Sequence, residues 1–113
     1  MGVFVINKRE NGDFQFNLKS GNGQIVLSSQ GYSSKTSCEN GIESVRLNSQ
    51  DDSKFDFKIA SNGKFYFVLK AANGQIIGTS EMYESESSLR GGIGSVKMAA
   101  KDALVKDLSL VNA

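Results

Sequence analysis

The chain of 113 residues contains the same sequence pattern twice, at an offset of about 51 residues. Residues 11–49 align with residues 62–100 without a gap, and each stretch begins at an Asn-Gly pair. The positions that match include Phe14 with Phe65, Phe16 with Phe67, Tyr32 with Tyr83, Gly41 with Gly92 and Ile42 with Ile93. Because one short unit cannot bury its own apolar face, such a repeat predicts two equivalent units that share one core.

Each copy begins with the alternation of apolar and polar residues that is typical of a half-buried strand. In residues 13–19 the apolar side chains fall at every second position, and residues 64–70 keep the same apolar set. Asn-Gly pairs separate these runs and favour tight type I′ turns, because both residues tolerate a positive φ. The pattern predicts strands over residues 3–9, 13–19, 24–29, 54–60, 64–70 and 75–80.

The hydrophobic period then changes to that of a helix. Cys38, Ile42 and Val45 share one helical face, and their counterparts Leu89, Ile93 and Val96 repeat it. Ser34 and Ser85 are suitable N-caps. The sequence therefore predicts helices over residues 34–48 and 85–99, with a close approach of helix to sheet at the glycine inside each, Gly41 and Gly92. Residues 103–110 are predicted to form a last strand.

The predicted order is β-β-β-α, β-β-β-α, β, which favours a two-layer α+β fold. Short hairpins make sequential strands antiparallel, and the helices must cover one face of the sheet to bury their apolar stripes. We expect one continuous antiparallel sheet with two helices on one face and a pseudo-twofold axis between the copies. Residues 1–113 would form a single domain, with repeat 1 at about 1–51, repeat 2 at about 52–102 and a C-terminal strand at about 103–110.

The combined spacing resembles a known family. The pattern F-x-F-x-L-K-x-x-N-G-Q-I, then S-x-x-Y-x-S, then G-I-x-S-V occurs at Phe14–Val45 and again at Phe65–Val96. It resembles the YegP-like family of small bacterial proteins, which exist as single-copy dimers or as tandem repeats. The resemblance implies a two-layer α/β fold in which terminal strands complete the sheet across the pseudo-dimer. It implies no activity, because the family is uncharacterised and has no assigned catalytic or binding residues.

Composition argues against an enzyme. The chain has no histidine, which removes the commonest general base and metal ligand. Its one cysteine, Cys38, has Leu89 as its counterpart and is expected to pack in the core. Glu81, Glu84 and Glu86 lack the spacing of a calcium loop and are interpreted as a solvated acidic turn. We therefore predict no catalytic residue, no cofactor and no metal site.

Charge and hydropathy limit the partners. The net charge of +1 gives no global field to attract nucleic acid or an acidic membrane. The apolar run Val3–Ile6 is too short for a signal peptide core or a membrane span, so we expect a cytoplasmic protein without membrane contact.

The first functional hypothesis is a non-enzymatic interaction protein that uses the open sheet face or a sheet edge to bind a protein partner. The predicted binding residues on the open face are Gln15, Asn17, Lys19, Tyr66, Val68 and Lys70, and we expect the same face to include Val26 and Ile77. Tyr66 and Val68 are the expected anchors, because the first copy has polar residues in their places.

The alternative is a nucleic-acid-binding protein that uses Lys19, Lys35, Arg46, Lys70 and Lys97. Because both repeats lie in one chain, the closed unit is expected to be a monomer. Strand edges or the open face would allow a weaker homodimer.

Overall fold

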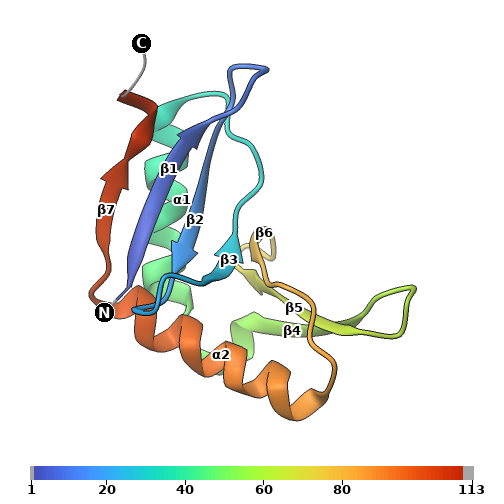
Figure 1. The fold of residues 1–113 in the computed structure, drawn as a ribbon. Coiled ribbons are helices and arrows are strands. Elements are labelled where there is room, and N and C mark those ends of the chain that lie inside the picture. Colours follow the sequence, from blue (N-terminus) through green and yellow to red (C-terminus); the bar gives the residue numbers. More distant parts are fainter. Residues whose placement is uncertain (1, 111–113) are drawn as a thin grey trace.

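One sheet of seven strands, with two α-helices against one of its faces, accounts for most of residues 2–110, the part of the chain that the computed structural model describes (Figure 1). The strands are β1 (Val3–Lys8), β2 (Phe14–Lys19), β3 (Ile25–Ser28), β4 (Phe55–Ile59), β5 (Phe65–Lys70), β6 (Ile76–Thr79) and β7 (Leu104–Asp107). The helices are α1 (Lys35–Asn48) and α2 (Glu86–Lys101). Short 3-10 turns, η1 (Asp52–Lys54) and η2 (Leu108–Leu110), precede β4 and follow β7. The predicted two-layer α+β fold is confirmed.

The strand order is β4-β5-β6-β3-β2-β1-β7, so each repeat forms one half of the sheet. The halves meet between β3 and β6, where Ser28 pairs with Thr79. One detail of the prediction is wrong: β7 runs parallel to β1, so the sheet is mixed and not wholly antiparallel. Helix α2 causes this direction, because it carries the chain back to the end of the sheet at which β1 begins. The strand is also shorter than predicted, since residues 108–110 form η2.

The four Asn-Gly hairpins exist, but they are not type I′ turns. Only the glycine of each pair has a positive φ, between 85° and 92°. The turn closes one residue earlier than expected, as in the 2.9 Å hydrogen bond that the Gly12 amide donates to the Arg9 carbonyl. This is the loop in which a tight turn is followed by a left-handed glycine. Asn11 assists by accepting a 2.9 Å hydrogen bond from the Asp13 amide.

The two repeats share one core between the sheet and the helices, as predicted. Its fully buried side chains include Phe4, Ile6, Phe16, Leu18, Leu27, Phe67 and Leu69 from strands and Cys38, Ile42, Val45, Leu89 and Val96 from helices. Val26 and Ile77 also belong to this core and not to the open face. The register of the sheet shifts beside each of them, at Leu18/Lys19 and Leu69/Lys70, and such a shift breaks simple alternation.

The helix glycines are needed for a tyrosine and not for the sheet backbone. A Cβ at Gly41 would lie 2.5 Å from the Tyr32 hydroxyl oxygen and 3.2 Å from the ring of Phe16. Tyr32 is held there by a strand-like bridge to Phe14, and Tyr83 approaches Gly92 in the same way. Ser34 and Ser85 cap the helices as predicted, each accepting a 3.1 Å hydrogen bond from an amide three residues on.

Candidate interaction surfaces

The predicted binding residues share the face of the sheet away from the helices. Strand pairing places one residue of each strand in a row across this face, in the order Asp56, Val68, Thr79, Ser28, Asn17, Val5 and Lys106. Gln15, Lys19, Tyr66 and Lys70 flank the row, and all four are partly buried. Val68 is only 3% exposed, so this expected anchor offers little surface to a partner.

Polar groups on the open face are largely bonded to one another. Lys70 forms a 3.1 Å ion pair with Asp56, and Lys58 lies 3.5 Å from the same carboxylate. The hydrogen bond from Lys70, together with the positive charges of Lys70 and Lys58, lowers the pKa of Asp56. The Gln15 amide donates to Asn17 and to the Ser29 carbonyl, at 3.3 Å each. The structure thus brings the predicted residues together, but several of their polar groups already form hydrogen bonds or ion pairs with other groups on this face.

The cations of the nucleic-acid alternative are mostly paired with carboxylates. Lys35 contacts Asp107 at 2.7 Å, Arg46 contacts Glu43 at 3.2 Å, Lys70 contacts Asp56, and Lys97 contacts Asp52. These pairs are spread over both helices and the open face, and they form no continuous basic stripe that would follow a phosphate backbone. The arrangement gives the nucleic-acid alternative no support.

The side chains that could act as nucleophiles or metal ligands do not gather in one place. Cys38 is fully buried, and burial, followed by the charge of Glu39, raises the pKa of its thiol to about 11, opposite to what a nucleophile needs. Glu84 contacts Lys64 at 3.0 Å and Glu86 contacts Arg90 at 3.6 Å. Within residues 2–110 no three Cys, Asp or Glu side chains are grouped so as to hold a metal ion. No helix in that range has the length and apolar character needed to cross a membrane.

Strand β4 forms one outer edge of the sheet and exposes apolar side chains there. It pairs with β5 on its inner side and has no strand on its outer side among residues 2–110. Its side chains on the helix-covered side are Phe55, Phe57 and Ile59. Phe57 is 42% exposed and Ile59 is 72% exposed, whereas Ile6, the counterpart of Phe57 in β1, is fully buried. Exposed apolar groups on an unpaired edge are features of a contact surface.

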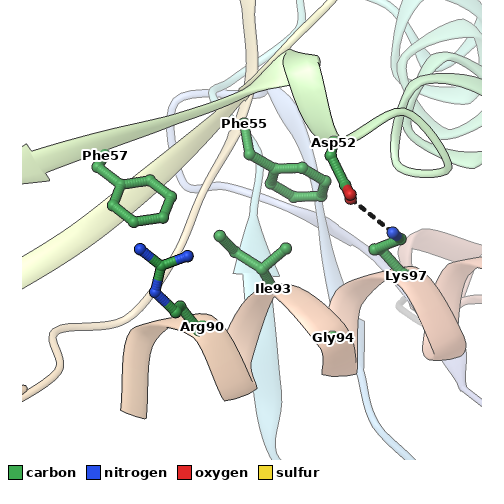
Figure 2. A pocket seen from close by; sticks show the side chains of 7 residues that line it. All are labelled: Asp52, Phe55, Phe57, Arg90, Ile93, Gly94 and Lys97. Atoms are coloured by element: carbon green, nitrogen blue, oxygen red, sulfur yellow. Dashed lines mark hydrogen bonds and ion pairs between the residues drawn. The ribbon is translucent and has the colours of Figure 1, made fainter. Parts of the chain in front are cut away.

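A groove of about 410 Å³ separates this edge from α2 (Figure 2). We call it the β4–α2 groove, and its lining residues are Asp52, Phe55, Phe57, Arg90, Ile93, Gly94 and Lys97. The Arg90 guanidinium lies 5.2 Å from the centre of the Phe57 ring at one end. At the other end Lys97 donates a hydrogen bond to Asp52. The groove therefore has an apolar floor, a cation at one end and an ion pair at the other.

Two residues of α2 that line the groove differ from their counterparts in the first repeat. A Cβ at Gly94 would meet only open space, whereas its counterpart Glu43 contacts Arg46. Arg90 stands where the first repeat has Glu39. The groove was not predicted from the sequence, because differences between the copies were used only for the open face, at Tyr66 and Val68. The signal available was the set of positions at which the copies differ, including Ile59 in place of Lys8.

Comparisons with known proteins agree with the fold. Residues 10–56 and 60–107 each match a family described as a domain of unknown function, DUF1508. The chain is 52% identical to the UPF0339 protein YegP of Escherichia coli K12, covering 94% of this chain and 96% of that protein. It is 49% identical, with the same coverage, to a UPF0339 protein of Pseudomonas aeruginosa.

Two solution NMR structures resemble it closely. That of yegP from E. coli, titled a protein of unknown function, has a TM-score of 0.92 at 50% identity, covering 98% of this chain and 96% of that one. That of a UPF0339 protein from Shewanella oneidensis has a TM-score of 0.92 at 45% identity, covering 98% and 94%. These likenesses extend over nearly the whole chain and bring no activity with them.

Proposed function

The chain belongs to the DUF1508 family of domains of unknown function, as its resemblance to YegP-like proteins predicted, and on this premise we propose that it is a non-enzymatic interaction protein that binds a partner protein at the β4–α2 groove. The observation that carries the proposal is the exposure of Phe57 beside Arg90, on strand β4, which has no strand on its outer side among residues 2–110. Aromatic and arginine side chains contribute most strongly to protein interfaces. Charged groups surround the apolar floor of the groove, and an apolar centre with a polar rim is typical of protein interfaces.

We place the binding site at the sheet edge and not on the open face, because among residues 2–110 the edge has more exposed apolar side chains and unpaired backbone groups. On the open face Val68 is buried and the polar side chains bond to one another. On the edge, the backbone groups of β4 that point away from β5 have no strand partner among residues 2–110. A partner at the edge therefore gains both apolar contact and backbone hydrogen bonds.

The non-enzymatic part of the proposal rests on the available side chains. Because the chain has no histidine, a general base near neutral pH would have to be a carboxylate, lysine or cysteine whose pKa is strongly shifted. The carboxylates with shifted pKa values, Asp51, Asp56 and Asp107, all shift downward, which keeps them ionised and weakly basic. The thiol of Cys38 shifts upward and is fully buried.

Affinity capture from a native lysate, with and without nuclease, tests the proposal. Wild-type protein is compared with Phe57→Thr in the groove, with Tyr66→Gln on the open face, and with Leu47→Gln as a control on α1, where Leu47 is 76% exposed. We expect capture of a protein partner that resists nuclease, persists with Tyr66→Gln and Leu47→Gln, and is lost with Phe57→Thr.

Two results would contradict the proposal. Loss of capture with Tyr66→Gln alone would transfer the binding site to the open face. Capture that disappears after nuclease treatment would favour nucleic acid as the partner.

A further inference from the structure

A strand from the C-terminal part of the chain is added at the outer edge of the first repeat. Strand β7 pairs in parallel with β1, in the register Val3 with Leu104, Phe4 with Val105 and Ile6 with Asp107. Val105 and Asp107 therefore lie on the helix-covered side, next to the buried residues Phe4 and Ile6. A 2.7 Å ion pair between Asp107 and Lys35 joins the strand to α1.

The second repeat has the same edge, and no strand among residues 2–110 covers it. Phe55 and Phe57 of β4 are the counterparts of Phe4 and Ile6 in β1. In repeat 2 the segment after the helix, residues 103–107, contains the strand β7 on the edge of β1. Its counterpart in repeat 1, residues 52–56, continues directly into β4 itself. A strand cannot lie beside itself, so among residues 2–110 the edge of β1 has an added strand and the edge of β4 has none (Figure 1).

We propose that the outer edge of β4 binds an extended segment of a partner protein as a parallel strand, in the way that the edge of β1 binds β7. The inference rests on the proposed function and specifies the mode of binding and the chemistry of the partner. The segment places an apolar side chain in the β4–α2 groove beside Phe55, and a carboxylate two residues later beside Phe57 and Arg90. Strand addition supplies affinity through backbone hydrogen bonds, and alternate side chains supply specificity.

The charge of the partner follows from the position of Arg90. In the first repeat the acidic residue opposite Ile6 is held by Lys35, but the counterpart of Lys35 is Glu86. Arg90, one turn further along α2, lies over Phe57, which is the counterpart of Ile6. Its contact with Glu86 is long, at 3.6 Å, and both side chains are more than 60% exposed. A carboxylate on the added strand is therefore a stronger partner for the guanidinium fork.

The size of the apolar side chain follows from the groove. The groove has a volume of about 410 Å³, and Gly94 adds no side chain to it where Glu43 stands in the first repeat. This space accepts a residue larger than the valine that β7 places beside Phe4. The preferred segment thus has a bulky apolar residue, any residue, and then Asp or Glu.

A peptide with the sequence of residues 103–110 is the probe. It is titrated into ¹⁵N-labelled full-length protein, and the expected shifts lie in β4 and in the Arg90–Lys97 turns of α2. In the peptide, Val105→Phe should tighten binding by about tenfold through added apolar contact. Asp107→Lys in the peptide should abolish binding, and Arg90→Glu in the protein should restore it for that peptide alone. Leu47→Gln in the protein serves as the control and should change nothing.

Several outcomes would overturn the strand proposal. Chemical-shift changes confined to β1 and α1 would mean that the peptide exchanges with β7. Absence of saturable binding by both the parent peptide and its Val105→Phe form would exclude strand addition at β4. Concentration-dependent shifts of β4 without peptide would mean that this edge pairs with a second copy. The proposed function is tested separately by lysate capture. If Phe57→Thr abolishes capture while no peptide binds, the groove is the interaction site and parallel strand addition is the wrong mode.

Discussion

The side chain of Leu27 occupies the space that a Cβ atom at position 78 would need, with Leu27 Cδ2 only 2.5 Å from that position. Leu27 and Gly78 are counterparts in the repeat and lie on β3 and β6, the two strands at which the halves of the sheet meet. Near the pseudo-twofold axis both positions approach the same point. The core therefore holds one leucine there, and the other copy must have glycine.

Gly78→Ala is accordingly expected to destabilise the protein by about 1–3 kcal/mol, the usual cost of overfilling a packed core. Leu27 is fully buried, so it cannot move out into solvent to make room for the added atom. Urea unfolding of the purified variant measures the effect. In a double-mutant cycle, Leu27→Val should recover part of the loss, because valine lacks the δ carbons that the added Cβ meets. A loss for Gly78→Ala below about 0.5 kcal/mol would contradict this packing.

The same substitution at two counterpart positions should have different costs. Ile6→Thr places a hydroxyl group and a smaller side chain in the core, and about 2–4 kcal/mol of the free energy of unfolding should be lost. Phe57→Thr affects a residue that is 42% exposed, so the loss should stay within about 1 kcal/mol. Thermal or urea unfolding of both variants makes the comparison. Equal losses would mean that Phe57 belongs to the core and is not free to bind a partner.

Cys38 should be unreactive in the folded protein. Its side chain is fully buried and burial raises the pKa of the thiol to about 11, so a disulfide reagent at pH 8 should label it only through unfolding. The same reagent in concentrated urea is the control and should react at once. Cys38→Ala should cost about 1–2 kcal/mol through lost burial and a small cavity. Fast labelling without urea would show that the thiol is accessible.

The raised pKa of the Cys38 thiol should also make the free energy of unfolding depend on pH. Because the folded protein favours the neutral form, its stabilising effect is complete below the ordinary pKa of 9.0 and is lost as the pH rises toward about 11. Between pH 8 and pH 11 the wild-type protein should therefore lose more free energy of unfolding than Cys38→Ala does. Equal losses in the two proteins would exclude the thiol as the cause.

Asp107 should hold β7 in place only while it is ionised. Partial burial raises its pKa, but the hydrogen bonds from Lys35 and Ser109 outweigh this effect and the net pKa is lowered. A lowered pKa means stability that is present above the ordinary value near 4 and is lost as the pH falls through the lower folded value.

Asp107→Asn should therefore cost about 0.5–1 kcal/mol at pH 7, as expected for a single partly exposed ion pair. The difference between variant and wild type in urea unfolding should shrink as the pH falls below the ordinary value near 4 and through the lower folded value. A difference that stays constant as the pH is lowered through this range would assign the effect to packing and not to charge.

The repeat made most of the fold predictable. Positions that both copies share, such as Phe16 and Phe67, satisfy the same structural need twice, and their alternation indicated the core face correctly. The parallel direction of β7 was not predictable from its own residues, because it depends on where α2 delivers the chain. Nor was the burial of Val68. Alternation assigns a residue to a face but does not show how exposed it is there, and Val68 is only 3% exposed.

The candidate site was missed because the differences between the copies were compared on the open face and not along β4 and α2. The groove exists where Gly94, Arg90 and Ile59 depart from Glu43, Glu39 and Lys8, and where an edge that β7 covers in one half has no strand in the other half of residues 2–110. Shared positions report on folding, whereas differing positions report either on packing near the pseudo-twofold axis, as at Leu27 and Gly78, or on contacts at the surface.

The direction of the bound strand tests the central claim most directly. A nitroxide label at the N-terminus of the peptide of residues 103–110 broadens the amide signals of the ¹⁵N-labelled protein that lie closest to it. Parallel addition to β4, in the register that β7 has on β1, predicts the strongest broadening at Lys54 and Phe55 and weaker broadening at Ile59. The strongest broadening at Ile59, or at β1, would contradict the claim that the edge of β4 is the binding counterpart of the edge that β7 covers.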